Sequence, residues 1–200
     1  MKQFILSLML ALFAGQTLQA QITTSVEVLP VGTSLDHVMV TSDYFTMLGE
    51  VALYGFVEYS GEGGGWFADQ SATWMPTKHV GFAGEASTDN NENSRSSFGP
   101  AFKPSVPGFA SLTILPTVVF GTPDFDRELK IVWRTKDVPA LGGVIWSEGF
   151  VRTLRNNGAH TYGQPQLWWR NSTESSWHFG VEAEVFGSDR TVRAGFRKVF

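Results

Sequence analysis

The chain has 200 residues, with 15 basic and 19 acidic side chains and a formal net charge of -4. The absence of cysteine excludes disulfides, thiol catalysis and cysteine-based metal sites, and no basic run of the kind that binds nucleic acid is present. Glycine is abundant, with 21 residues, and aromatic residues make up 14 %, whereas the hydrophobic fraction is only 42 %. This combination suits a chain in which only alternate residues of each strand contact lipid.

The first twenty residues have the three-part pattern of a cleaved signal peptide. Lys2 precedes a short apolar run at 4–14, and a more polar stretch ends at Ala20. We therefore expect cleavage after Ala20 and export of residues 21–200. Beyond Ala20 no apolar stretch approaches the about 18 residues of a transmembrane helix, so a membrane-embedded mature protein has to cross as a closed barrel.

Alternation of apolar and polar residues with a period of two predicts ten strands in the mature chain. Residues 21–35 read as a weak extended lead. The expected strands cover 37–48, 50–59, 66–75, 78–86, 109–120, 127–136, 144–154, 164–170, 177–186 and 191–200. Residues 87–108 read as the longest loop, with a short strand at 96–102 as an alternative that would change the count.

Three positions interrupt the alternation. Gln70 is a misfit on the apolar side of its strand. Pro116 predicts a bulge, and so does the neighbourhood of Gly149, because Glu148 falls on the same side as Trp146.

Residues 177–200 predict a β-hairpin in which one register satisfies both faces. With Ser188 and Asp189 as the turn, Glu184 lies opposite Arg193, and the apolar residues of the two arms also face each other. Each arm then has one apolar and one charged side. In a membrane barrel the charged side lines the interior.

Aromatic residues and strand length favour a membrane barrel over a soluble sandwich. Tyr59, Trp66, Trp74 and Trp177 cluster near strand ends, as in the aromatic girdles of membrane barrels. Strands of about ten residues suit a tilted membrane crossing. We predict an all-β fold with one domain at 21–200, a single closed antiparallel transmembrane β-barrel of about ten strands, with eight or twelve as alternatives.

The end of the chain resembles the C-terminal signature of Gram-negative outer-membrane β-barrels, which finish on Phe after alternating apolar residues. The matching residues are Val192, Ala194, Phe196 and Phe200, whereas Lys198 departs from the pattern. The resemblance implies an outer-membrane location, contact with outer-membrane lipid, and recognition of the last strand by the barrel-insertion machinery. Lys198 could extend to the periplasmic headgroups.

A second resemblance covers roughly residues 49–200. The order of LYGFVEY, EGF, QPQLWW, FGVEAEVF and a final K-x-F looks like the nucleoside-specific channel-forming (Tsx-like) porins. Known members are longer, so this chain would be a shortened relative. The resemblance implies a narrow interior that passes small hydrophilic solutes such as nucleosides. The implied selectivity elements are Tyr54, Phe56, Trp168, Glu182, Glu184, Arg193 and Arg197.

The faces opposite the apolar stripes give a candidate solute pathway. Its residues are Glu50, Tyr54, Phe56, Glu58, Lys130, Arg134, Trp168, Arg170, Glu182, Glu184, Arg193 and Arg197. We predict a narrow passive channel for small polar solutes, with no cofactor, metal or nucleic-acid partner. No spacing marks a nucleophile or a set of metal ligands, so an enzyme is not expected.

Two other functions remain open. One is a non-conducting structural or adhesive outer-membrane barrel that acts through its surface loops, its interior charges forming a satisfied plug. The other is a secreted soluble β-barrel with an apolar interior that binds an apolar ligand.

Overall fold

The computed structural model describes residues 21–28, 38–60, 65–90, 94–121, 126–155 and 159–199; the expected signal peptide and Phe200 lie outside this part. Its strands are β1 (Gln21–Val28), β2 (Val38–Leu48), β3 (Val51–Ser60), β4 (Trp66–Trp74), β5 (Val80–Asp89), β6 (Ser94–Phe102), β7 (Phe109–Phe120), β8 (Asp126–Thr135), β9 (Val138–Ala140), β10 (Gly143–Arg155), β11 (Ala159–Arg170), β12 (Trp177–Phe186) and β13 (Asp189–Val199). The predicted all-β antiparallel class is confirmed. Among these residues, no helix is long and apolar enough to cross a membrane.

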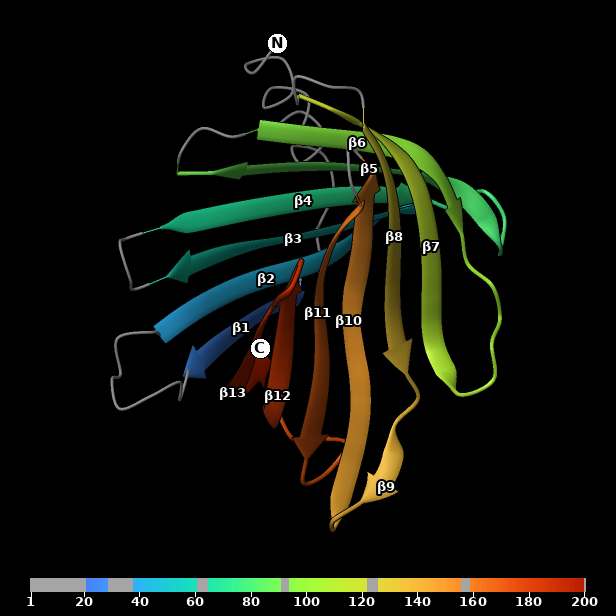
Figure 1. Cartoon of the computed structure of the whole chain (residues 1–200). Helices are drawn as coiled ribbons and strands as arrows, with labels where there is room; N and C mark the ends of the chain where they lie inside the picture. The colour runs from blue at the N-terminus through green and yellow to red at the C-terminus, as the bar shows by residue number, and fades with distance from the viewer. Residues whose placement is uncertain are drawn as a thin grey trace.

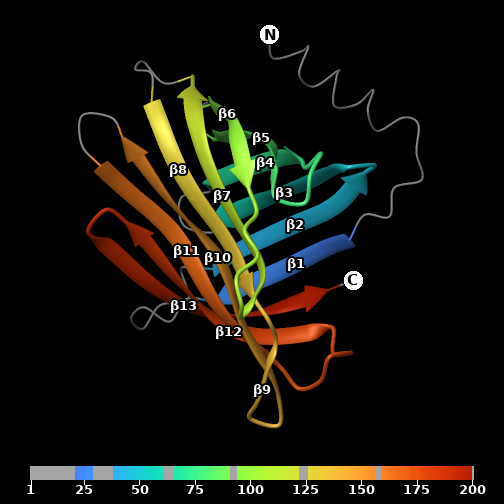
Figure 2. The same ribbon diagram turned by 90° about the vertical axis from the view of Figure 1, so that its right-hand side faces the viewer.

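The twelve long strands pair antiparallel with their neighbours in chain order (Figures 1 and 2). β10 pairs with both β8 and β11, and β13 pairs with β1, so the pairings run through all twelve strands and return to the first. The three-residue β9 pairs with the beginning of β10 alone. The expected number of ten strands is wrong, because the described residues form twelve long strands.

β1 and β6 account for the two additional strands. β1 covers the stretch that reads as a weak lead, and it pairs with both β2 and β13. β6 lies within the expected long loop, where a short strand was the alternative. It pairs with β7 in one register on both sides of Pro100 and Pro116, which fall opposite each other. Neither proline has an N–H group to donate, so the ladder is interrupted there without a shift.

Both expected bulges are absent from the described strands. The register shift of β7 lies between Phe109 and Ser111 rather than at Pro116. β10 pairs with β11 without a shift from Val144 to Arg155. Gly149 has a φ of 143°, and a Cβ atom there would lie 2.2 Å from the carbonyl oxygen of Gln164. Trp146 and Phe150, the inward aromatic residues on either side of Gly149, therefore belong to one strand without a bulge.

The β12–β13 hairpin forms with a register two residues away from the predicted one. Gly187, with a φ of 60°, and Ser188 form the turn, so Glu182 rather than Glu184 pairs with Arg193. Glycine adopts this backbone conformation without strain, which favours the turn at this position. Because side chains alternate with a period of two, a two-residue shift leaves both faces unchanged.

The outer surface is apolar and carries aromatic residues at both strand ends. Tyr59 pairs with Trp66 at one end of β3 and β4, and Trp74 lies at the other end, where its ring is 6.3 Å from that of Phe82. Trp177 is at the same end as Trp74, the end where the described chain begins and finishes. The Lys198 ammonium lies 4.9 Å from the centroid of the Trp177 ring and donates to Ser176 at 2.6 Å.

The interior is polar. The described buried residues include Asp69, Glu128, Lys130, Arg152, Gln164, His178 and Glu182, whereas the buried hydrophobic residues are Ala83, Ala101, Val119, Trp146 and Trp168. Large apolar residues are exposed on the outside instead. This distribution is the reverse of that in a soluble protein, and it contradicts the apolar interior that a soluble ligand-binding barrel requires.

Candidate solute pathway

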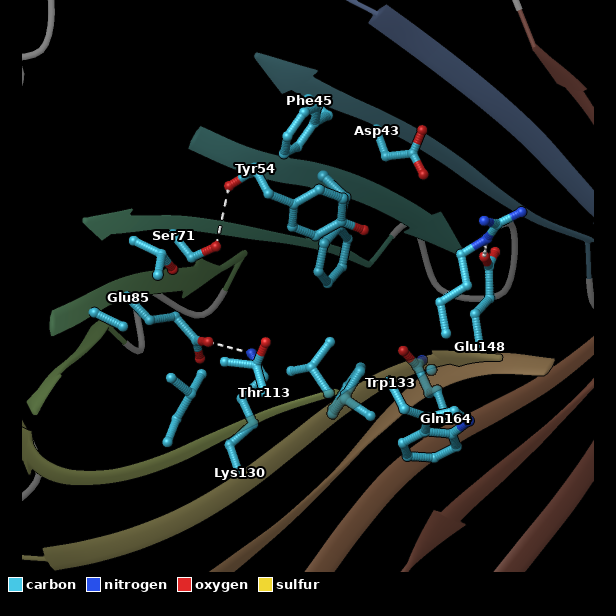
Figure 3. A pocket seen from close by; sticks show the side chains of 18 of the residues that line it. Asp43, Phe45, Tyr54, Ser71, Glu85, Thr113, Lys130, Trp133, Glu148 and Gln164 are labelled. Atoms are coloured by element: carbon cyan, nitrogen blue, oxygen red, sulfur yellow. Dashed lines mark hydrogen bonds and ion pairs between the residues drawn. The ribbon is translucent and has the colours of Figure 1, made fainter. Parts of the chain in front are cut away.

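The ring of strands encloses a cavity of about 620 Å³. Its lining comes from β2 to β8 and from β10 to β13. Acidic, basic, amide and hydroxyl side chains share the wall with the rings of Tyr54, Phe56 and Phe150. In Figure 3 a dashed line joins Glu85 and Lys130 inside this space. The wall can therefore hydrogen-bond a polar solute and also pack against its apolar parts.

The structure brings most of the predicted pathway residues together. Tyr54, Phe56, Glu58, Lys130, Arg134, Glu182 and Arg197 line the cavity. Trp168 is buried beneath Arg197, whose guanidinium lies 4.3 Å from the indole centroid. Arg193 binds Glu182 at 3.2 Å and also binds Glu184. The predicted contact between Glu184 and Arg193 is thus present despite the shifted register, and Glu182 is a second partner of Arg193.

Five predicted pathway residues do not line the cavity: Trp168, Glu184 and Arg193, described above, and also Glu50 and Arg170. Glu50 is in the turn between β2 and β3, where it accepts a hydrogen bond of 3.2 Å from the indole of Trp74. Trp74 belongs to the outer surface, so Glu50 is placed at the barrel rim. Arg170 is near one mouth of the interior and binds Asp137 at 2.5 Å.

A buried group of ion pairs crosses the interior around Arg152. Its guanidinium lies 3.1 Å from a carboxylate oxygen of Glu85, 3.7 Å from Asp69 and 3.8 Å from Glu128. Lys130 also binds Glu85, and Arg95 binds Glu128. β4 and β5, which carry Asp69 and Glu85, are not neighbours of β10, which carries Arg152. These contacts therefore join separate parts of the wall and narrow the interior.

The sequence pattern missed Arg152 and Arg95. Arg152 follows the expected break near Gly149, and Arg95 lies in the expected loop. The signal that could have identified them is charge balance. Arg95, Lys130 and Arg152 are matched in number by Asp69, Glu85 and Glu128, as buried charges require.

Basic side chains stack on aromatic rings along the β8–β10–β11 wall. Arg134 and Arg170 lie 5.6 and 5.1 Å from the ring of Trp146. Lys130 and Arg152 both lie 5.1 Å from the ring of Phe150. Cation–π attraction is strongest where water is excluded, so these contacts explain why aromatic residues share the inner face of β10 with Glu148.

No family model matches the sequence, and no curated protein matches it either. Among solved structures, the chain is similar to the KdgM porin in complex with disordered oligogalacturonate, with a TM-score of 0.57 and 10 % identity over 90 % of this chain and 99 % of that one. A second KdgM porin structure gives a TM-score of 0.55 at the same identity and coverage. The chain thus has a porin-like β fold.

Proposed function

We propose that this protein is a closed outer-membrane β-barrel that forms a narrow passive channel for small hydrophilic solutes. One observation carries the proposal: a cavity of about 620 Å³, lined by charged and hydroxyl groups as well as aromatic rings, lies inside a ring of twelve strands whose outer surface is apolar. A sheet of this kind can expose its outer surface to lipid and its inner surface to water. No backbone edge is left unpaired in such a ring, which is a condition for crossing a bilayer with strands.

Several independent features support the outer membrane as the location. The sequence pattern at 1–20 predicts export, and Val192, Ala194 and Phe196 match the terminal signature of outer-membrane barrels. Val192 is 60 % exposed on the outer surface, as expected of a residue that contacts lipid. The fold is similar to that of the KdgM porin, and a non-enzymatic transport role agrees with that likeness. The last strand is our candidate for recognition by the insertion machinery.

The solute class follows from the mixed lining. Charges of both signs and hydroxyl groups favour small polar molecules, while Tyr54 and Phe56, whose ring centroids are 6.2 Å apart, offer apolar surface within the same cavity. Nucleosides combine a flat ring with hydroxyl groups and therefore remain a candidate solute. The similar KdgM porin was solved with an oligogalacturonate, so acidic sugars form a second candidate class.

Single-channel recording tests this function. Residues 21–200, folded in detergent and added to a planar bilayer, should give discrete openings, and nucleosides or galacturonate should reduce the current if they enter. A barrel that inserts but never conducts would favour the structural or adhesive alternative. A protein that stays soluble without detergent and does not insert would overturn the membrane assignment.

A further inference from the structure

Two arginines and a histidine surround Trp146 near one mouth of the interior. Arg134 of β8 and Arg170 of β11 stack on the Trp146 ring, and His178 of β12 meets it edge-on with ring centroids 4.9 Å apart. The two arginines thus come from the strands on either side of β10. We call Trp146, Arg134, Arg170 and His178 the Trp146 cluster.

Asp137 bridges the two arginines of this cluster. Its Oδ1 atom lies 3.1 Å from Arg134, and its Oδ2 atom accepts a hydrogen bond of 2.5 Å from Arg170. Asp137 belongs to the connection between β8 and β9, outside the twelve-strand ring. Figure 1 shows the β9–β10 hairpin extending beyond the neighbouring strands at this end. The carboxylate is therefore held by a short connecting segment at the mouth.

A second carboxylate lies beside the cluster. Glu148 is 3.6 Å from Arg134 and is also bound to Arg197. Among the described atoms, Arg170 Nε has no hydrogen-bond partner. Among the described ion pairs, removing the charge of Asp137 would leave Arg134 with Glu148 as its partner and Arg170 with none.

We propose that Arg134 and Arg170 form a binding site for an oxyanion group of a solute. Asp137, which the connection between β8 and β9 holds in place, competes with that group for the two arginines. The site takes a carboxylate or phosphate group, because two guanidinium groups held side by side match the two oxygens that Asp137 now presents. The inference rests on the proposed channel, since it assigns these residues to a mouth of that channel.

The contact of this ion pair with water favours the replacement of Asp137 by an incoming oxyanion. The side chains of Arg134, Asp137 and Arg170 are 40 %, 27 % and 16 % exposed, whereas that of Arg152 is 4 % exposed. An ion pair in contact with water contributes little to stability, so an incoming oxyanion can replace Asp137 at small cost. The buried pairs around Arg152 do not offer this possibility, because separating them leaves charges without water.

The reversal potential in a KCl gradient tests the proposal. Asp137→Asn should raise the permeability of chloride relative to potassium by about three-fold or more, because charge at a mouth sets the local ion concentration. Inorganic phosphate should also block Asp137→Asn at lower concentrations than it blocks the wild type. Glu50→Gln is the matched control, since it removes one negative charge from the barrel rim outside the interior. It should change the relative chloride permeability less than Asp137→Asn does and leave the phosphate block unchanged, because it lies away from Arg134 and Arg170.

Arg134→Gln combined with Arg170→Gln should abolish the phosphate block. Thermal unfolding in detergent provides a readout that does not need conduction: phosphate should raise the melting temperature of Asp137→Asn more than that of the wild type or Glu50→Gln. Equal phosphate shifts in all three proteins would overturn the proposal, even if the channel conducts. A silent wild-type barrel with a phosphate shift specific to Asp137→Asn would instead contradict the channel function alone.

Discussion

Gln70 is a polar residue on the apolar outer surface, and its contacts show how such a residue is accommodated there. Tyr44, Gly55 and Gln70 lie in one row across β2, β3 and β4. The Tyr44 ring covers Gly55, where a Cβ atom would lie 2.7 Å from it, and its hydroxyl group accepts a hydrogen bond from the Gln70 amide. In lipid no water could replace this partner, so the two polar groups satisfy each other.

Tyr44→Phe should lower the free energy of unfolding by about 1 kcal/mol, because the Gln70 amide is left without its partner. Tyr44→Phe combined with Gln70→Leu should recover most of that loss, since both polar groups are then absent. Urea-dependent unfolding from lipid vesicles measures both changes. Equal destabilisation by the single and the double variant would show that the hydrogen bond is not the cause.

At the scale of strands, the alternation of apolar and polar residues predicts ten of the twelve long strands. The apolar face of a strand can be recognised in the sequence without knowing which strand it pairs with. The sequence indicates β6 only as an alternative to a loop, because Gly99 and Pro100 interrupt its pattern and its existence depends on pairing with β5 and β7. The hairpin register was wrong for a related reason. The face of each residue depends on the chain locally, whereas the exact partner depends on the conformation of Gly187.

In the candidate site, too, the sequence predicts which face a residue lies on but not which residues it contacts. The inward faces of Tyr54, Lys130 and Arg197 were predictable from alternation alone. The contacts of Arg152 with Asp69 and Glu85 were not, because they join strands that are distant in the ring. Such contacts depend on the cross-section of the barrel, which no short sequence pattern records.

These cross-wall contacts give a prediction for β10. Arg152→Ala should lower the free energy of unfolding by about 3–5 kcal/mol, because Glu85, Asp69 and Glu128 lose a buried counter-charge. It should also raise the single-channel conductance, since the interior widens there. Arg127→Ala is the control, because Arg127 is exposed on β8. Unchanged conductance in an Arg152→Ala barrel that remains folded would place the pathway elsewhere.

For the whole molecule, the decisive property is the inversion of polar and apolar surfaces. In a soluble β protein an arginine on the exposed face would be harmless and one in the interior would be destructive. In a membrane barrel the order reverses, because the exposed face meets hydrocarbon and the interior meets water. Val181, which is 43 % exposed near the middle of β12, and Thr113, which lines the cavity from β7, are suitable positions to compare.

Val181→Arg should destabilise the protein in lipid vesicles by about 2–4 kcal/mol, the cost of placing an arginine near the bilayer midplane. Thr113→Arg should change stability much less, because its guanidinium can reach water and the carboxylates of the interior, while the altered wall should change the conductance. Folding titrations in vesicles measure the first effect, and bilayer recordings measure the second. If Val181→Arg were tolerated and Thr113→Arg prevented folding, the outer surface would face water and the protein would not be a membrane barrel.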